Sequence, residues 1–243
     1  MTTMTLLTAI MLSAIASESS GSRQLQDDAR TSPARIALPG PRLDGQLPLE
    51  QALAKRRSVR QYARTALTLA ELSQLCWAAQ GTTSDDGRRS APSAGATYPL
   101  ELIVVAENVS GLGPGIYRYR SADHSLTMMR TGTVRESLAV AALSQDAVRQ
   151  APVTLVLSAV SSRTTTRYGG RGTRYIHMES GHAAQNVALQ AVAMGLGSLT
   201  LGAFRDDEVN RILGLDQGEE SLYLLPVGHP SQANREESHE KSQ

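Results

Sequence analysis

Apolar and polar residues follow two different rhythms between residues 49 and 230, and together they predict interleaved helices and strands. Helical spacing of apolar residues predicts helices over 49–55, 68–80, 134–143, 176–194 and 207–213. Alternating or continuous apolar runs predict strands over 100–106, 115–119, 125–130, 152–160, 199–204 and 222–227. Because these elements follow no regular βαβ rhythm, the pattern favours a single α+β domain.

Three of these elements carry further local signals. Thr68 is suited to cap the second helix, Glu71 follows three residues later, and Gly81 is suited to end it. Residues 152–160 form an unbroken apolar run, which predicts a strand buried on both faces. The helix over 176–194 is rich in Ala and apolar almost all round, which predicts burial or a place in a subunit interface.

The two ends of the chain lack such patterns. We expect a lead-in over 1–48, where Pro39-Gly40-Pro41 blocks regular structure, a folded domain over 49–230, and a polar tail over 231–243. Residues 1–16 are mostly apolar and end in Ala-Ile-Ala, like the cleavage site of a signal peptide, but no Lys or Arg precedes them. Two interpretations remain: a cleaved signal peptide of an exported protein, or an unstructured start of a cytoplasmic one.

Charge and cysteine content narrow the classes of partner. Lys and Arg number 24 against 23 Asp and Glu, a net charge of +1, so no global field attracts nucleic acid or an anionic membrane. An anion site must therefore be local. The single cysteine, Cys76, lies in an apolar helical run, so we expect a buried, inert thiol and no internal disulfide. No apolar stretch reaches the roughly 18 residues that a membrane-spanning helix needs.

A basic cluster follows the first predicted helix. Arg56, Arg57, Ser58 and Arg60 place three guanidinium groups and a hydroxyl within five residues. Such a set suits a phosphate, because guanidinium groups match phosphate oxygens in pairs. By itself the cluster is more typical of a solvated basic turn.

Two further segments are rich in small residues. Residues 91–99 lead into an apolar strand, and their small side chains allow the backbone to approach a flat or phosphorylated ligand. The same composition is also typical of an ordinary loop. Ser93 lacks the GxSxG spacing of a hydrolase nucleophile. Glycines 195, 197 and 202 come between a helix and a strand, the reverse of the dinucleotide-binding order. A helix end explains Gly195, and a flat ligand would explain the later glycines.

The histidines do not predict a metal site. His177 and His182 are five residues apart, roughly 140° around a helix, so they cannot converge with Glu179 on one ion. A hydrogen-bonded core or interface role is the better interpretation, and we predict no metal.

Several ordered motifs between residues 49 and 230 resemble those of the nitroreductase superfamily, and most closely its azoline-oxidase branch, the SagB/ThcOx-type dehydrogenases. They are Arg-Arg-Ser-x-Arg at 56–60, Pro-Ser-Ala-Gly-x-x-Tyr-Pro at 92–99, Gly-Ile-Tyr-Arg-Tyr at 115–119, Glu-x-Gly-His-x-x-Gln-Asn at 179–186 and Pro-Val-Gly-x-Pro at 226–230. The resemblance implies an α+β fold with a central, mainly antiparallel sheet flanked by helices. It also implies a homodimer with FMN at the subunit interface, acting as an oxidoreductase through flavin N5.

The resemblance assigns roles along the chain. Arg56, Arg57, Ser58 and Arg60 would hold the phosphate, ribityl chain and pyrimidine edge of FMN, with Gly228 and His229 at the phosphate end. Gln145, at the end of the helix over 134–143, would hydrogen-bond the ring. The ring would lie near N5 against Leu201, Gly202 and Ala203. The partner subunit would line the same flavin with Pro92, Ser93, Ala94 and Gly95.

One departure from the branch concerns the acid/base residues. Its oxidases use a Lys-Tyr pair, and the matching positions here are Arg167 and Tyr168. Arginine stays protonated and cannot act as a base, whereas Tyr168 can still donate or relay a proton, with Tyr98 as a second wall for the substrate.

Two hypotheses follow. The first is an enzyme that dehydrogenates azoline-type heterocycles, on a small molecule or a peptide, or reduces nitro or quinone-like groups, with NAD(P)H or O2 as redox partner. The second is a flavin-binding or partner-binding protein without turnover. Neither involves nucleic acid or a membrane. An exported protein would have to acquire its flavin either before transport or outside the cell, which is unusual. This requirement favours a cytoplasmic location over a periplasmic one.

Overall fold

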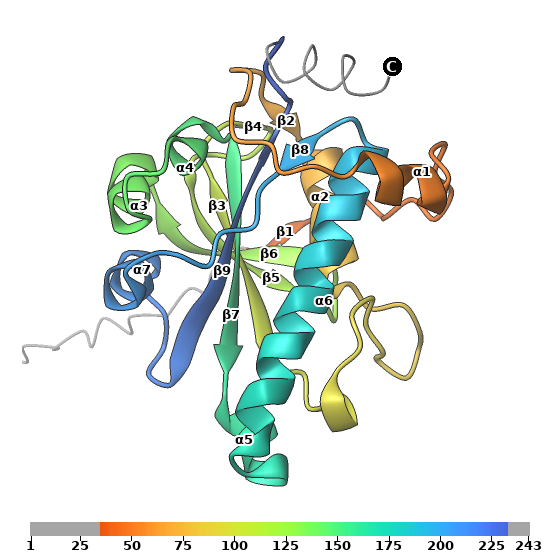
Figure 1. Ribbon diagram of the computed structural model, residues 1–243, viewed down its shortest axis with the longest axis vertical. Coiled ribbons are helices and arrows are strands. Elements are labelled where there is room, and N and C mark those ends of the chain that lie inside the picture. The colour runs from red at the N-terminus through yellow and green to blue at the C-terminus, as the bar shows by residue number, and fades with distance from the viewer. Residues whose placement is uncertain (1–34, 233–243) are drawn as a thin grey trace, which may run out of the picture. The chain divides into compact units, whose positions relative to one another are not determined.

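The computed structural model describes residues 35–232, which lie in the unit Pro33–Gln243. The predicted signal peptide and nearly all of the predicted tail lie outside the described residues. Within them, a sheet with the strand order β1-β6-β5-β3-β7-β9-β8 is antiparallel at every pairing (Figure 1). Its strands are β1 Arg35–Ala37, β3 Leu100–Ala106, β5 Gly115–Arg120, β6 Ser125–Thr131, β7 Val153–Val160, β8 Gly197–Ser198 and β9 Glu219–Gly228.

Helices cover both faces of this sheet, and Figure 1 shows α2 and α6 on one side and α3 and α7 on the other. Two short strands, β2 Leu67–Thr68 and β4 Val109–Ser110, pair in parallel apart from the main sheet. The helices are α1 Leu49–Lys55, α2 Leu69–Gln80, α3 Arg135–Ala141, α4 Asp146–Gln150, α5 Ser162–Tyr168, α6 Arg171–Ala193 and α7 Asp206–Leu213. No helix among the described residues is long and apolar enough to cross a membrane.

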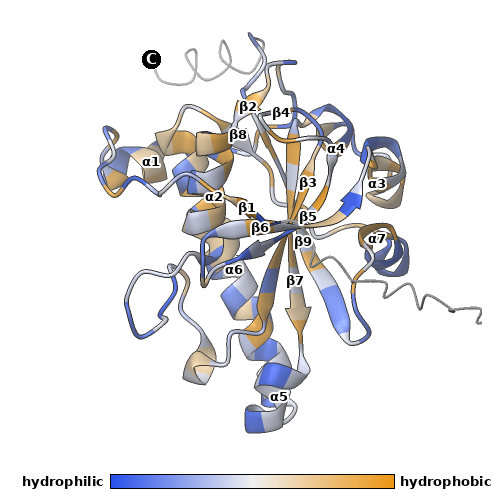
Figure 2. Cartoon of the chain, turned by 180° about the vertical axis from the view of Figure 1, so that it is seen from behind, coloured by the Kyte–Doolittle hydropathy of each residue, from blue (hydrophilic) through white to orange (hydrophobic). Residues whose placement is uncertain are grey.

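Alternation along the central strands produces two hydrophobic cores. Leu102 and Val104 of β3 belong to the core shared with α2 and α6, whereas Ile103 and Val105 belong to the core shared with α3 and α7. Successive strand residues point to opposite faces, so a strand covered on both sides must be apolar throughout. Figure 2 shows the resulting apolar colouring along the central strands. The prediction of a strand buried on both faces is confirmed for β7, and β3 has the same property.

Most of the predicted elements are confirmed, and α1 begins and ends at the predicted residues. Thr68 caps α2 in a capping box: its side chain accepts from the Glu71 N–H, and the Glu71 carboxylate accepts from the Thr68 N–H at 2.7 Å. Gly81 ends that helix as expected. Cys76 is fully buried, and burial raises the pKa of its thiol far above the usual range, as an inert thiol requires.

Three predictions need correction. The predicted strand over 199–204 is wrong: the strand β8 is Gly197–Ser198, and within 199–204 only Leu201 bridges to β9, before the exposed Gly202 and Ala203. The long helix starts at Arg171 rather than at residue 176, because its first turns are polar and carry no apolar period. The lead-in contributes β1, which pairs with β6 before the Pro39-Gly40-Pro41 block.

Candidate functional site

The basic segment 56–60 lies along the edge of the sheet beside β8. Ser58 and Ser198 form a parallel bridge, and the Val59 N–H donates to the Ser198 carbonyl at 2.9 Å. The Tyr62 hydroxyl donates to the carbonyls of Val59 and Pro226, at 2.7 and 2.9 Å. This buried tyrosine therefore ties the basic segment to the end of β9.

Two glycines make this close approach feasible. A Cβ on Gly197 would lie 2.6 Å from the Val59 side chain, and one on Gly228 would lie 2.7 Å from Pro152 and 3.0 Å from Tyr62. Any larger residue would push the basic segment off the sheet. The predicted residues of segments 56–60 and 228–229 are thus brought together, and the Ala63 N–H also donates to the His229 carbonyl at 2.8 Å.

The basic segment keeps its positive charge unopposed. Among residues 35–232, no carboxylate forms an ion pair with Arg56, Arg57 or Arg60. Arg57 donates to the carbonyls of Ala54 and Arg56, whereas Arg60 is exposed. Three uncompensated guanidinium groups beside the Ser58 hydroxyl form a site that attracts an anion.

The segment after β8, the strand that pairs with the basic segment, contains exposed residues. The Leu201 N–H donates to the Leu224 carbonyl at 2.8 Å, which holds the segment against β9. Gly202 and Ala203 then leave the sheet with their backbones exposed. A Cβ on Gly202 would meet only the Tyr223 ring, at 3.4 Å, so this side is open enough for a flat ligand to approach the peptide groups.

The segment 92–98 is a strained turn at the other end of the molecule. Gly95, Ala96 and Tyr98 all have positive φ, of 59°, 53° and 44°. Such angles are uncommon for residues with a side chain, and they persist only where surrounding contacts enforce them. One enforcing contact is the Tyr98 N–H, which donates to the Ser93 hydroxyl at 2.9 Å.

Glu179 lies beneath this turn, and the sequence indicated it only as a motif residue without a role at the site. Its side chain is buried, accepts a hydrogen bond from Ser93, and leaves Oε1 without a partner among the described residues. Burial raises the pKa of Glu179 to about 7, opposed by the Ser93 hydrogen bond and the nearby Arg89 charge. Arg89 stacks over the Tyr98 ring at 4.6 Å. Glu179 was recognisable only as part of a motif, because its burial depends on the packing of α6.

Arg167 and Tyr168 end α5, directly against the strained turn. Arg167 donates from Nη1 to the Gly95 carbonyl at 3.0 Å, and Arg163, one turn earlier, donates to the Tyr98 carbonyl at 3.1 Å. The Tyr168 hydroxyl lies so near Gly95 that no side chain fits at that position. The structure therefore brings Arg167 and Tyr168 together with the segment 92–98, and the Arg167 guanidinium has a hydrogen-bond partner in that turn.

Gln145 is placed differently from the prediction. The helix predicted over 134–143 ends at Ala141, and Gln145 instead precedes α4 as its N-cap residue. Within the described residues its side chain makes no hydrogen bond to another predicted site residue. The structure thus leaves its predicted contact with a ring untested.

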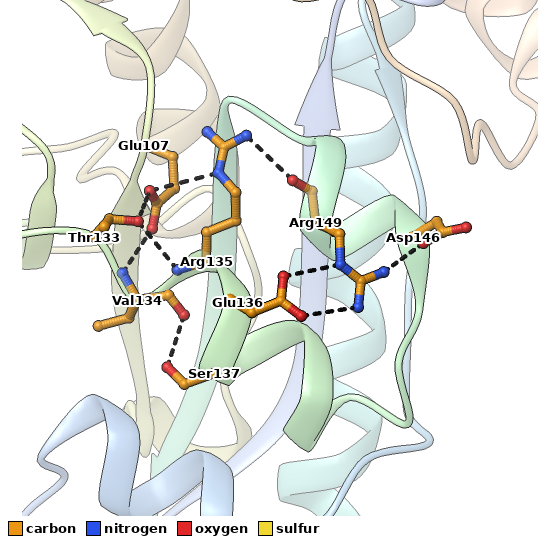
Figure 3. Close-up of polar contacts among 8 residues, drawn as sticks. All are labelled: Glu107, Thr133, Val134, Arg135, Glu136, Ser137, Asp146 and Arg149. Atoms are coloured by element: carbon orange, nitrogen blue, oxygen red, sulfur yellow. Dashed lines mark hydrogen bonds and ion pairs between the residues drawn. The ribbon is translucent and has the colours of Figure 1, made fainter.

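An ion-pair network holds α3 and α4 together (Figure 3). Arg149 pairs with Glu136 at 3.0 Å and with Asp146, and Arg135 donates to the Arg149 carbonyl at 3.2 Å. Glu107, at the end of β3, accepts from the Val134 N–H at 3.0 Å and anchors the start of α3. The short connection that carries Gln145 is therefore fixed at both ends.

The predicted site residues fall into two groups at opposite ends of α6. Glu179 contacts the turn over 92–98, whereas the end of α6 packs against β8, beside the basic segment. From Glu179 to Ala193 a helix rises about 20 Å. Figure 1 shows the same separation, with β8 and α1 at one end of α6 and α5 at the other. One chain does not bring the segment 92–95 to the segment 56–60.

Comparison with known proteins identifies the family. The model of the Nitroreductase family matches residues 53–229, which is well over half of the chain. The chain belongs to the nitroreductase family. A nitroreductase-family protein of Methanocaldococcus jannaschii is 47% identical over 183 residues, covering 75% of this chain and 91% of that protein.

Solved structures agree with this assignment. A nitroreductase-family structure from Anabaena variabilis has a TM-score of 0.73 at 29% identity, covering 82% of this chain but only 42% of that chain. The match therefore spans less than half the length of that structure. The Escherichia coli microcin synthetase McbBCD, solved with truncated pro-MccB17 bound, contains a chain with a TM-score of 0.64 at 25% identity, covering 73% of this chain and 70% of that chain. The predicted family and its α+β fold are confirmed.

Nitroreductases are generally flavin-dependent oxidoreductases, and the groups of this chain suit such a cofactor. The uncompensated guanidinium groups of segment 56–60 match a phosphate, and the open backbone at 202–203 matches a flat ring. Among residues 35–232, no group of three or more His, Cys, Asp or Glu is placed to hold a metal ion.

Proposed function

We propose that this nitroreductase-family protein is an FMN-dependent oxidoreductase that acts on an azoline-type heterocycle or on a nitro or quinone-like group. The observation that carries the proposal is the pairing of the basic segment, with its unpaired Arg56 and Arg60, to β8, the strand that leads within a few residues to the exposed Gly202 and Ala203. A cation cluster beside accessible peptide groups suits a cofactor with one phosphate and one flat ring.

Each group of the basic end has a distinct role in this proposal. Arg56, Arg57 and Ser58 hold the phosphate and ribityl chain, with Gly228 and His229 closing the phosphate end. Arg60 offsets negative charge at the pyrimidine edge. Leu201, Gly202 and Ala203 support the ring near N5, and Gln145 hydrogen-bonds its edge. When bound, FMN supplies hydride transfer at N5.

The strained turn supplies the other wall of the site in a homodimer. Because segment 92–95 lies about 20 Å along α6 from the basic end of its own chain, Pro92, Ser93, Ala94 and Gly95 would reach the flavin of a second copy. Large apolar side chains exposed on the flank of the molecule support association: Leu43 is 82% exposed, Leu49 61% and Met178 53%. Leu43 and Leu49 also line a groove of about 720 Å³ between α1, α2 and α6.

Tyr168 is the proton donor or relay of the proposed reaction. Its hydroxyl lies at the surface of the turn over 92–98, so a substrate beside that turn would meet it. Tyr98 would form a second wall. Arg167 cannot accept a proton, and its hydrogen bond to Gly95 makes it a positioning residue for the turn.

The resemblance to a peptide-processing complex extends the proposal to substrate and partners. The microcin synthetase was solved with a precursor peptide bound. For this chain we accordingly propose a peptide or small heterocycle as substrate, with NAD(P)H or O2 as redox partner.

The test uses the full chain, purified and incubated with FMN. We expect a yellow protein that oxidises NADPH in the presence of menadione. Replacing Arg56 and Arg60 by Gln is expected to weaken FMN binding at least about tenfold, because each charge-assisted hydrogen bond contributes about 1.5–3 kcal/mol. Arg211→Gln, an exposed change on α7, is the matched control. A chain that takes up no FMN overturns the proposal.

A second candidate function is favoured by the contact of Arg167. At the position proposed for the catalytic lysine this chain has an arginine, which donates to the Gly95 carbonyl and cannot act as a base. A flavin-binding protein without turnover is therefore the alternative. It predicts a yellow protein whose flavin spectrum is unchanged by NADPH, quinones or azoline peptides. Spectral reduction by any one of these overturns the alternative.

A further inference from the structure

A concentrated positive charge lies at the start of α6, away from the basic segment 56–60. Residues 162–178 contain Arg163, Arg167, Arg171 and Arg174 and no acidic residue, in a chain whose net charge is only +1. All four are exposed, and Figure 2 shows polar colouring over α5 and the adjoining turns of α6. This end of the molecule is therefore locally cationic.

The four arginines differ in their partners. Arg163 pairs with Glu101 at 2.6 Å and donates to the Tyr98 carbonyl, and Arg167 donates to the Gly95 carbonyl. Arg171 and Arg174 have no hydrogen bond or ion pair from their side chains to any described residue. The first two hold the turn, and the second two have their full donor capacity available.

The two arginines without partners lie on the same helix face as Tyr175, whose ring contacts Tyr168. Arg171 and Arg174 are three residues apart, and Tyr175 follows Arg171 by four, so all three lie on one side of α6. Tyr175 packs edge-on against Tyr168, with ring centroids 5.2 Å apart. A group that contacts Tyr168 is thus within one or two helical turns of both guanidinium groups.

We infer that Arg171 and Arg174 bind a carboxylate of the substrate, so that the chain prefers anionic substrates over neutral ones of the same shape. This inference rests on the proposed function, because it takes Tyr168 to lie at the reacting group. A guanidinium group binds a carboxylate through paired hydrogen bonds, whereas a neutral substrate would gain no charge interaction from two free arginines side by side. Since each exposed charge pair contributes about 1.5- to 5-fold in affinity, two give roughly 2- to 25-fold.

The test compares para-nitrobenzoate with para-nitrobenzamide, two probes of nearly equal size that differ by one negative charge. Their affinities for the full purified chain are measured by calorimetry, with and without added FMN. We expect a roughly 2- to 25-fold preference for the benzoate that shrinks as salt rises from about 0.05 to 0.3 M. In the double variant Arg171→Gln/Arg174→Gln, the affinity ratio falls towards one, whereas Arg211→Gln keeps it.

Each outcome decides one claim. Equal affinity for the two probes, or a preference that the double variant retains, overturns the inference even if FMN binds and turns over. Absence of FMN binding overturns the proposed function. A benzoate preference lost in the double variant then still supports the carboxylate site itself.

Discussion

Arg167 donates a hydrogen bond from its guanidinium to the Gly95 carbonyl at 3.0 Å. This contact joins the end of α5 to a turn in which Gly95 and Ala96 adopt left-handed backbone angles. By the motif resemblance, position 167 would match the lysine of the azoline oxidases, and here its side chain helps to fix the geometry of the turn. We therefore propose that Arg167 acts as a positioning residue.

Arg167→Ala is expected to loosen this turn. Loss of one hydrogen bond from a charged donor at the surface costs about 1 kcal/mol, so FMN affinity should fall about fivefold if the turn lines the flavin. Arg167→Lys should retain part of the affinity, because an ammonium group offers one donor where the guanidinium offers several. Flavin fluorescence titration measures both variants against Arg211→Gln. Unchanged affinity in Arg167→Ala would show that the turn does not depend on this contact.

Gly197→Ala tests the close approach at the basic end. The new Cβ would lie 2.6 Å from the Val59 side chain, so either β8 or the basic segment must shift. Overpacking of this kind costs about 1–3 kcal/mol, which lowers Tm by roughly 3–9 °C in a chain of this size. FMN affinity should fall together with Tm, because Arg56–Arg60 move with Val59. Gly40→Ala, where a Cβ meets nothing within 4 Å, is the control, and equal Tm values for the two variants would contradict the prediction.

How far the sequence predicts this molecule depends on where each element gets its stability. The strand β7 was predictable because both of its faces are covered, which leaves an unbroken apolar run. α5 was not, because Ser162–Tyr168 has three threonines, two arginines and no apolar face. That helix is held from outside, by the hydrogen bond between Thr97 and Thr164 at 2.8 Å and by arginine contacts to the turn. The residue pattern of the segment itself does not indicate contacts made by other parts of the chain.

The candidate site shows the same division. Segments 56–60 and 226–230 stand out in the sequence because phosphate-binding chemistry and close packing demand particular residue types. Glu179 does not stand out, because its raised pKa follows from burial that only the packed helix creates. The separation of the two groups of site residues along α6 likewise requires the three-dimensional structure.

Glu219→Gln is expected to destabilise the sheet. Arg118 on β5 donates to both carboxylate oxygens of Glu219 on β9, at 3.0 and 2.9 Å, and the Glu219 side chain is only 1% exposed. Removing the buried carboxylate charge leaves Arg118 with the longer ion pair to Glu101, at 3.4 Å, and costs about 3 kcal/mol, or roughly 6–12 °C in Tm. Arg205→Gln breaks the exposed pair with Glu208 and should cost less than about 1 kcal/mol. Similar losses in the two variants, by urea unfolding, would contradict the prediction.

Glu179 should make stability depend on pH. Burial raises the pKa of this carboxyl from 4.5 to about 7, so between these values the folded chain holds a proton that the unfolded chain has lost. Its contribution to the free energy of unfolding is therefore largest at low pH and falls as pH rises through this window. Above pH 7 the buried carboxylate costs about 3 kcal/mol relative to a neutral group.

Glu179→Gln removes this titration while keeping an oxygen that can accept from Ser93. We expect the variant to gain about 3 kcal/mol over the wild type at about pH 8, and to match it at about pH 5 within roughly 1 kcal/mol. Glu220→Gln, an exposed change on the same chain, should leave the pH profile as it is. Urea unfolding at the two pH values measures all three proteins. Parallel pH profiles for the wild type and Glu179→Gln would mean that this carboxyl titrates at its usual pKa, and that the turn over 92–98 does not rest on a protonated group.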